Sequence, residues 1–461
     1  METDPSHTGE ERGNQSRRTF LTTAAGAASA AVFAGRLGGS ETLALYGGTP
    51  VRSTLLFAEV SGPQYYDDEE RNALNEVLQN KTPFRYQSFR RGPKPDKCSG
   101  FEQEFAAHQH TKYCVAVTSG TMALHTAMAA LDVGPGDEVI LPAYTWYACY
   151  NAVVLAGALP VFVEIDDSMN IDPTDIEHRI TPRTKVIMPV HILGEAADMD
   201  AIMALARRHN LKVLEDCAQG VGASYQGKPV GSIGDCGIYS FQVSKTVSAG
   251  EGGALVTNDP EVFERAARFS DVGFLREQQE KMLGRSPRYQ PFAAGQYRMN
   301  EFTGAVMRSQ TRKLDRIVAD YRDKGIRVTK QLQDLEDIHF RKLNDDGGLR
   351  RVVFMRTSNR QQRDQCIRAM EAENIAAGPM EGSVILPAVP FIEKKQTLEP
   401  DWPTFQSPAG RAIRYGAEVC PRTIAVHDAY AGVYMDPKFS DQDVADIVAA
   451  VKKVYPRIMR T

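Results

Sequence analysis

Short runs of apolar residues recur along the first half of the chain, and polar residues, glycine or proline separate them. Runs of this length bounded by turn-forming residues are typical of buried strands. The pattern predicts seven strands, over residues 114–117, 138–141, 159–165, 185–191, 212–215, 236–241 and 254–257.

Stretches with helical character separate most of these strands, notably residues 122–131, 147–155 and 199–209. Strands that alternate with helices form right-handed β-α-β crossovers and a mostly parallel sheet. The last two predicted strands are joined by a loop without a long helix, so we expect the final strand to be antiparallel. The fold class predicted from the pattern is therefore α/β.

The regions on either side of the predicted sheet have their own patterns. The acidic residues 67–70 open a predicted helix that ends near residue 78. A long helix is predicted from residue 301 to about 332, and it leads into a smaller α/β domain. That domain contains a predicted strand and two predicted helices, over residues 351–355, 360–373 and 441–455.

This organisation divides the chain into four parts. We expect a signal segment over residues 1–34, an N-terminal arm over 35–60, a large domain over 61–310 and a small C-terminal domain over 311–461.

Composition narrows the class of protein. The chain has 461 residues, of which 42% are hydrophobic and 24% are charged, as expected for a soluble globular protein of two or three domains. The net charge is −4 and there is no basic tail, which argues against a nucleic-acid partner. Seven cysteines are scattered without a C-x-x-C pair, so no zinc site, other metal site or complete disulfide framework is predicted.

The N-terminus has the pattern of an export signal. Ser16, Arg17, Arg18, Thr19, Phe20 and Leu21 precede an Ala-rich run that ends near Ala34, and this resembles a twin-arginine signal. The run is too short and too rich in small residues for a stable membrane span. A disordered basic arm is the alternative interpretation, and it would leave the protein in the cytoplasm.

Polar side chains follow two of the predicted strands. Asp216 follows the strand at 212–215, while Ser240 and Lys245 lie at or just beyond the end of the strand at 236–241. In open α/β sheets the carboxyl ends of strands form the ligand-binding edge. A lysine amine can form a Schiff base with an aldehyde cofactor, an acid can hold a pyridinium nitrogen protonated, and a hydroxyl can bind phosphate.

Three motifs around these residues resemble those of a known family. They are E-D-C-A-Q at 215–219, S-F-Q-x-S-K at 240–245 and A-G-E-G-G at 249–253. The chain resembles the DegT/DnrJ/EryC1/StrS sugar aminotransferases, which are pyridoxal phosphate (PLP) enzymes of fold type I. The resemblance runs from about Gly47 to the C-terminus and is densest over residues 101–314.

The resemblance implies a cofactor and a role for each of four residues. Lys245 would form the Schiff base with PLP, and Asp216 would pair with the pyridine nitrogen. Gln219 would contact the cofactor's 3′ oxygen, and Ser240 its phosphate. It also implies a large domain built on a seven-stranded sheet.

Three further residues belong to the expected cofactor site. Gly120 and Thr121 stand between a predicted strand and a helix, where free backbone N–H groups and a hydroxyl could cradle phosphate. An ordinary helix N-cap is the alternative there. Trp146 follows the second predicted strand, where the family carries an aromatic residue that stacks on the pyridine ring, although core filling would also explain an aromatic residue at this point.

Two residues near these motifs favour structural roles. His191 matches the family's V-H-x-x-G motif and could approach the substrate or cofactor, but a hydrogen-bonded structural histidine is the preferred interpretation. Cys217 would point away from Asp216 across the strand, and we expect a buried, inert thiol.

The segment from Gly295 to Phe302 resembles the family's G-x-N-x-R-x-x-E motif. In the family, the Asn of this motif reaches the phosphate of the neighbouring subunit's cofactor, and Gln296 replaces it here. Both amides can donate to phosphate, but the extra methylene displaces the donor by roughly a bond length. The resemblance implies a homodimer with shared active sites.

Together these features predict a PLP-dependent aminotransferase. The donor would be glutamate or glutamine, and the acceptor a keto sugar or keto cyclitol. Candidate anion contacts are Arg285, Arg288 and Arg298, while the basic and aromatic loop at 81–97 could cover an anionic substrate or be a solvated surface loop. The alternative function is an exported PLP-binding or regulatory protein of the same fold without turnover.

Overall fold

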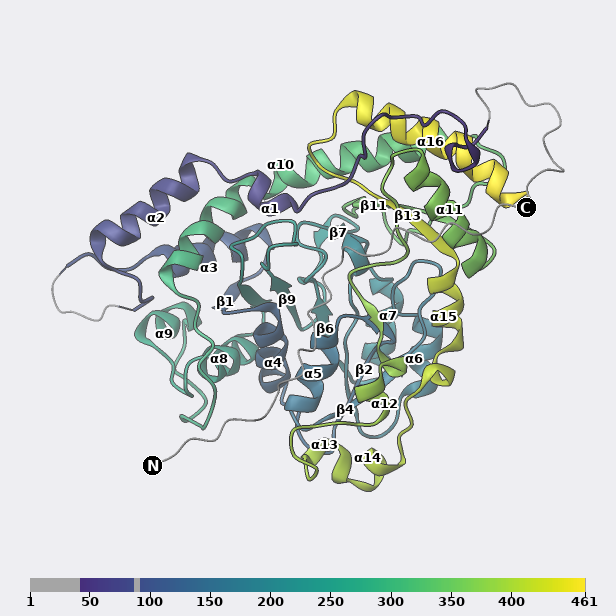
Figure 1. Cartoon of the computed structure of the whole chain (residues 1–461). Helices are drawn as coiled ribbons and strands as arrows, with labels where there is room; N and C mark the ends of the chain where they lie inside the picture. The colour runs from purple at the N-terminus through teal and green to yellow at the C-terminus, as the bar shows by residue number, and fades with distance from the viewer. Residues whose placement is uncertain (1–41, 87–91, 461) are drawn as a thin grey trace, which may run out of the picture.

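The computed structural model describes residues 42–86 and 92–460 (Figure 1). At its centre is a seven-stranded sheet. The strands lie in the order β1-β10-β9-β6-β5-β2-β4. Their bounds are Tyr113–Val117 for β1, Glu138–Pro142 for β2, Leu159–Val163 for β4, Thr184–Ile187 for β5, Lys212–Asp216 for β6, Cys236–Ser240 for β9 and Gly253–Thr257 for β10.

The pairing confirms the predicted sheet. β4, β2, β5, β6 and β9 are parallel neighbours, while β10 is antiparallel to both β9 and β1. The predicted extension of the fourth strand to residue 191 is wrong, because β5 ends at Ile187. Pro189 has no N–H for a ladder hydrogen bond, and beyond it Val190 makes only an isolated bridge to Asp216.

Helices cover both faces of the sheet (Figure 1). Alternate residues of β1 show the two faces, since Cys114 and Ala116 pack into one hydrophobic core and Val115 and Val117 into the other. The first core includes side chains of α3 (Lys97–His108), α6 (Pro173–Arg179), α7 (Met199–His209) and α10 (Glu301–Leu332). The second includes those of α4 (Gly120–Ala130), α5 (Tyr147–Leu155) and α8 (Pro260–Phe269).

Local signals set the helix boundaries. The predicted helix after the acidic run is α2 (Asp68–Asn80), and Asp67 and Glu70 form a capping box at its start. Asn300 caps α10, which has the predicted bounds. The remaining elements near the large domain are α1 (Ser61–Gln64), α9 (Glu277–Leu283) and a small hairpin of β7 (Ser224–Tyr225) and β8 (Lys228–Pro229).

The small domain lies at the far end of α10. Its two strands, β11 (Val352–Arg356) and β13 (Tyr430–Tyr434), are antiparallel. They pack with α11 (Arg360–Ala372), which matches the predicted helix at 360–373 to within one residue, and with α16 (Asp441–Met459). α16 extends four residues beyond the predicted helix at 441–455. α15 (Pro421–Asp428) leads into β13.

Residues 384–415 return from the small domain to the large one. β12 (Val384–Ile385) pairs antiparallel with β3 (Tyr144–Thr145), directly before Trp146. α12 (Pro390–Glu393), α13 (Pro403–Gln406) and α14 (Pro408–Ala412) follow at the base of the large domain (Figure 1). Leu386, Phe405 and Tyr415 belong to the hydrophobic core that contains α4 and α5. This segment therefore connects the small domain to the large domain.

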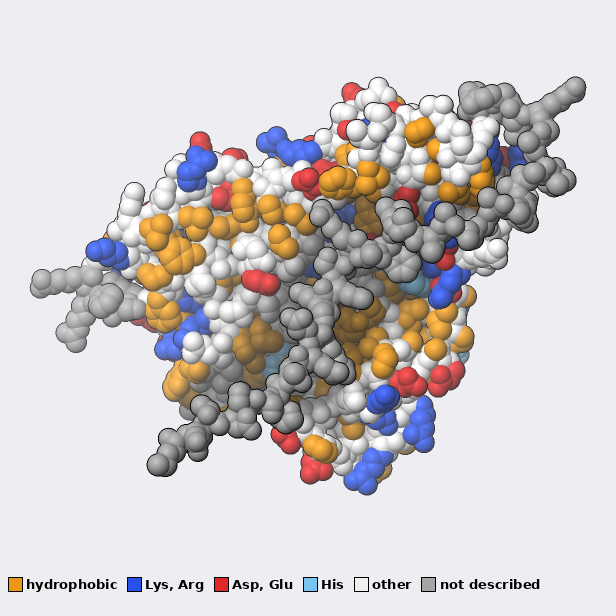
Figure 2. Space-filling model, in the orientation of Figure 1, with side chains coloured by type: hydrophobic (Ala, Val, Ile, Leu, Met, Phe, Trp, Pro, Cys, Tyr) orange, Lys and Arg blue, Asp and Glu red, His pale blue; other side chains and the backbone are white. Residues whose placement is uncertain are grey.

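Two observations concern the surface and the N-terminus. Figure 2 shows hydrophobic side chains gathered over α1 and α2 on one face, where Val60, Tyr66 and Leu78 are exposed. Within residues 42–86 and 92–460, no helix has the length and apolarity needed to cross a membrane. The predicted export signal at residues 1–34 lies outside the described residues, and the four-part domain division stays a prediction.

Candidate active site

A cavity of about 340 Å³ opens at the carboxyl ends of β6 and β9. It is also bounded by the start of α4 and by the β3–α5 junction. Seven of the eight site residues predicted from sequence line it: Gly120, Thr121, Trp146, Asp216, Gln219, Ser240 and Lys245. The expected convergence at the sheet edge is therefore present, and Gln296 is the exception.

Lys245 lies in the turn that follows β9. Its backbone N–H donates to the Gln242 carbonyl at 2.9 Å, which closes the turn. Burial lowers the pKa of the Lys245 amine, the positive charge of Arg351 lowers it further, and Asp216 acts in the opposite direction. A lowered pKa increases the neutral, nucleophilic fraction of the amine at neutral pH.

Asp216 lies at the end of β6 and is 3% exposed. Its Oδ1 accepts from the Ala218 backbone N–H at 2.9 Å, and its Oδ2 accepts from the Cys149 thiol at 3.0 Å. Burial raises the pKa of Asp216, while the two hydrogen bonds and the charge of Lys245 oppose that rise. A buried acid of this kind is stabilised in its charged form by a cation placed against it.

Cys149 was missed by sequence reasoning. It is buried on the first turns of α5, and burial raises the pKa of its thiol well above the ordinary value, so the thiol keeps its proton and donates to Asp216. Its neighbour Thr145 is 3.3 Å away from its sulfur. Cys149 lies 67 residues before Asp216 in the chain, so sequence spacing contained no signal for this contact.

The start of α4 is shaped to receive an anion. Ser119 caps the helix through a 3.2 Å bond from the Met122 N–H, so the capping alternative describes Ser119. A Cβ on Gly120 would lie 2.7 Å from the Ser240 Cβ. Only glycine thus lets the Ser240 hydroxyl approach the helix N-terminus, where free N–H groups and the helix dipole favour a phosphate.

Trp146 presents its ring to the cavity instead of filling the core. It is 52% exposed and directly follows β3. Core filling is therefore not its role, and a flat indole at the cavity wall offers a stacking surface for a planar ligand.

Gln219 is held between the two domains. Its Oε1 accepts from the Leu193 N–H at 2.9 Å, and its Nε2 donates to the Ser383 hydroxyl at 3.1 Å. Ser383 precedes β12, and sequence reasoning did not identify it. The small-domain segment therefore orients a predicted cofactor ligand of the large domain.

Gln296 is exposed and does not line the cavity of its own chain. It forms an isolated bridge with Asp271, on a segment whose next residue, Tyr297, accepts from the Thr118 N–H. Its contact with a cofactor in a neighbouring subunit stays a prediction.

The three candidate anion-binding arginines all have acidic partners within the chain. Arg285 lies 3.3 Å from Glu264, Arg288 pairs with Glu261, and Arg298 pairs with Asp271. In the basic loop, Arg85 is buried against Glu102 at 2.7 Å. These ion pairs give the arginines a structural role and leave the cavity's own residues as the better ligand contacts.

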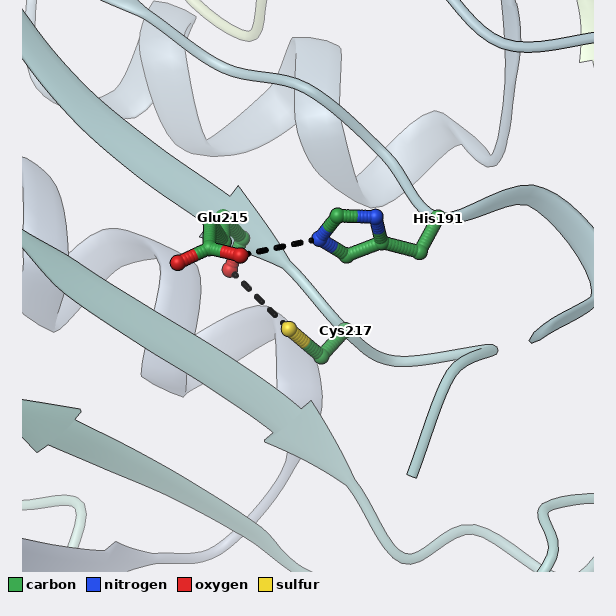
Figure 3. A group of neighbouring side chains, drawn as sticks. All are labelled: His191, Glu215 and Cys217. Carbon is green, nitrogen blue, oxygen red and sulfur yellow. Dashed lines mark hydrogen bonds and ion pairs between the residues drawn. The ribbon is translucent and has the colours of Figure 1, made fainter. Parts of the chain in front are cut away.

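His191, Glu215 and Cys217 form a buried group on the other side of β6 (Figure 3). His191 Nδ1 accepts from the Ala197 N–H, so Nε2 carries the proton that is donated to Glu215 at 3.1 Å. The Glu215 carboxylate also accepts three backbone N–H bonds, from Gly231, Ile233 and Gly234. With these lone pairs occupied, the group is a hydrogen-bonded network and not a metal site. His191 is hydrogen-bonded as predicted, and Cys217 is buried as predicted.

Glu215→Gln is therefore expected to destabilise the fold. The glutamine oxygen can accept from Ile233 and Gly234, but its NH₂ group would face the donors of Gly231 and His191. Two unpaired buried donors of this kind cost about 3 kcal/mol. A clearly lower thermal unfolding midpoint should result, and a midpoint equal to that of Glu336→Gln, whose side chain is 82% exposed, would contradict the expectation.

The cavity thus combines an amine, a buried acid, a hydroxyl beside a helix N-terminus and an exposed indole. This set fits a flat aldehyde cofactor that has a basic ring nitrogen and a phosphate. Ser240, which lies close to Gly120, would bind the phosphate of such a cofactor, and the buried Asp216 would pair with its ring nitrogen.

Comparisons with known proteins agree with this fit. A model of the DegT/DnrJ/EryC1/StrS aminotransferase family matches residues 64–452. The GDP-perosamine synthase of Caulobacter vibrioides is 39% identical over 300 residues, which cover 61% of this chain and 75% of that protein. A Streptomyces kanamyceticus protein with the provisional name L-glutamine:3-amino-2,3-dideoxy-scyllo-inosose aminotransferase is 33% identical and covers 90% of this chain and 97% of its own. The crystal structure of an aminotransferase from Psychrobacter cryohalolentis superposes with a TM-score of 0.72 at 27% identity, covering 87% of this chain and all of that one.

Proposed function

Because the chain belongs to the DegT/DnrJ/EryC1/StrS aminotransferase family, we propose that it moves an amino group from glutamate or glutamine to a keto sugar or keto cyclitol. It is a PLP-dependent aminotransferase. The observation that carries the proposal is the meeting of Lys245, Asp216 and Ser240 in one cavity. The acceptor class is supported by the relatives, whose names specify a perosamine synthase and an inosose aminotransferase.

Each residue of the cavity then has a role. When bound, PLP supplies an electron-withdrawing ring that holds the amino group between the two half reactions. Lys245 would hold the cofactor at rest and, when its amine is free, would carry the proton taken from the substrate carbon. Asp216 would keep a positive charge on the ring nitrogen, Trp146 would orient the ring plane, and Ser240 with the α4 N-terminus would bind the phosphate.

Absorbance tests this function directly. An absorption band at about 420 nm is expected for PLP attached to a lysine, and it should bleach when glutamine or glutamate is added. Nucleotide-linked keto sugars and keto cyclitols should then restore the band and yield an aminated product by mass spectrometry. A stable band that no amino donor bleaches would support the alternative of a PLP-binding protein without turnover.

The pH dependence of cofactor attachment should reflect the environment of Lys245. The amine must be neutral to attack, and burial together with Arg351 lowers its pKa from the ordinary value of 10.5. The attachment rate of the apoprotein should therefore rise with pH and level off below pH 10.5. A stopped-flow series that follows growth of the visible band measures this, and a rate still rising above that pH would contradict the prediction.

We further propose a homodimer whose subunits share active sites. Two features support it: the exposed apolar side chains over α1 and α2, and the position of Gln296 outside its own cavity. If sites are shared, mixed dimers of inactive Lys245→Ala chains and impaired Gln296→Ala chains should contain one intact site. Regained activity on mixing would support sharing, and a strictly monomeric active protein in sedimentation analysis would refute it.

Export by the twin-arginine route is a separate proposal, supported by the sequence pattern at residues 16–34. Since activated sugars are made in the cytoplasm, an exported member of this family would be unusual. The twin-arginine route carries folded proteins, so the cofactor could travel in place. Full-length protein found only in the cytosol of the native cells would refute the proposal.

A further inference from the structure

A second cavity, of about 330 Å³, adjoins the cofactor cavity, and Ser244 lines both. The arm before α1, the start of β11 and the segment that leads to β12 form its walls. It contains one cation, Arg351, and two acids, Glu59 and Glu381, together with the hydroxyl of Tyr434.

Arg351 is held in position by two uncharged groups. Its Nη2 donates to the Ser244 carbonyl at 3.2 Å, and its guanidinium lies 5.4 Å from the centre of the Tyr321 ring. Within residues 42–86 and 92–460, no carboxylate lies within ion-pair distance of it. The nearby Arg350 and Arg356, by contrast, pair with Glu195 and Asp167 at 2.9 Å. Arg351 therefore has N–H donors available for an anion.

The position of Arg351 relative to Lys245 indicates which anion. Ser244, which Arg351 contacts, is the residue next to Lys245, and the charge of Arg351 acts on the Lys245 amine. An amino donor must bring its α-amino nitrogen to the place of that amine. Its α-carboxylate is attached to the next carbon, and among the described residues that line the adjoining cavity Arg351 is the one cation that can pair with it.

Glu381 adds a second constraint on the donor. Its backbone N–H donates to the Tyr434 hydroxyl at 3.0 Å, and both its charge and that of Arg351 act on that hydroxyl. Glu381 and Glu59 are both exposed to solvent and line this cavity, so they bring negative charge to it. A γ-carboxylate there would be repelled, whereas a γ-amide could donate hydrogen bonds to the acid.

We propose that this cavity binds the amino donor, with Arg351 holding the α-carboxylate and Glu381 selecting glutamine over glutamate. The inference rests on the proposed aminotransferase function and specifies its donor. The acceptor sugar or cyclitol would enter afterwards, when the donor has left.

Arg351→Met tests the carboxylate contact. The donor KM should rise about 10- to 100-fold, the loss expected for a charge-assisted hydrogen bond, while the visible band and the acceptor KM stay unchanged. Glutaminamide has an uncharged amide in place of the α-carboxylate of glutamine. The wild type should react with it much more slowly than with glutamine, whereas the variant should react with the two compounds at about equal rates. Arg356→Met, on the same strand and outside the cavity, is the matched control.

Glu381→Gln tests the selectivity. The wild type should prefer glutamine about 10-fold in kcat/KM, and the variant should lose most of that preference by gaining activity with glutamate. Glu393→Gln, an exposed acid on α12, should leave the preference unchanged. A wild type that prefers glutamate, or an Arg351→Met protein with a normal donor KM, would overturn the proposal.

Two outcomes separate this inference from the proposed function. If Arg351→Met raises the acceptor KM alone, transamination stands and the assignment of the cavity to the donor is wrong. If no donor bleaches the wild type, the proposed function fails. Calorimetry then tests whether Arg351 binds the α-carboxylate, by comparing glutamine binding to the wild type and to Arg351→Met. Binding that is lost in the variant supports the carboxylate site, and binding that is equal in both proteins or absent from both overturns it.

Discussion

Replacing Lys245 with alanine should remove the visible absorption band of the purified protein and lower turnover by about 10³-fold or more. Of the described residues that line the cofactor cavity, Lys245 is the one amine. It has two tasks, covalent attachment of PLP at rest and proton transfer during each half reaction. No neighbouring side chain of the cavity can replace it in both.

The experiment separates these tasks and controls for folding. Lys228→Ala changes an exposed lysine on β8 and should retain colour and turnover. Small amines added to Lys245→Ala should restore part of the rate if the missing group is a proton carrier. Colour and turnover that survive undiminished in Lys245→Ala would contradict the assignment of the active site.

The sheet was predictable from sequence because its strands are covered on both faces. Such strands appear as continuous apolar runs, and the polar residues at their carboxyl ends mark the ligand-binding edge. Asp216, Ser240 and Lys245 follow this rule, so their convergence could be expected. The end of β5 was misplaced because Met188 and Val190 continue the apolar pattern past Pro189.

The parts that escaped prediction depend on contacts between distant segments. β3 and β12 are each two residues long, too short for a periodic signal, yet their pairing brings Ser383 to Gln219. The short helices after β12 each begin with proline and do not contain a repeating apolar face. The sequence also did not indicate which arginines are available to bind a ligand. Arg298 pairs with Asp271, whereas Arg351 donates to the Ser244 carbonyl, and neither contact can be inferred from sequence spacing.

The first two residues of the motif E-D-C-A-Q are adjacent on β6 but have different roles. Glu215 accepts four hydrogen bonds in a buried network on one side of the strand, and Asp216 faces the cofactor cavity on the other. The network fixes the backbone from which Asp216 projects. A change at Glu215 should therefore be read first as a change in stability, and one at Asp216 as a change in chemistry.

Asp216→Asn should lower turnover by about 10²- to 10³-fold while the fold is kept. Asparagine can still accept from the Ala218 N–H, but it has no charge with which to keep the pyridine nitrogen protonated. The ring then withdraws electrons less strongly, and the proton on the substrate carbon becomes harder to remove. An unchanged thermal midpoint of the apoprotein, together with slower bleaching by a saturating donor, is the expected result.

The Cys149 thiol gives this prediction a graded control. It donates to Asp216 Oδ2 at 3.0 Å and so helps to keep the carboxylate charged. Cys149→Ser retains a donor and should remain close to the wild type, while Cys149→Ala removes it and should slow bleaching by about 10-fold, roughly the value of one hydrogen bond to a charged group. Because the carboxylate is then harder to ionise, the loss should be larger at low pH and smaller at high pH. If Asp216→Asn turns over at the wild-type rate, the ring nitrogen is not held by this acid, and the assignment of Asp216 fails however Cys149 behaves.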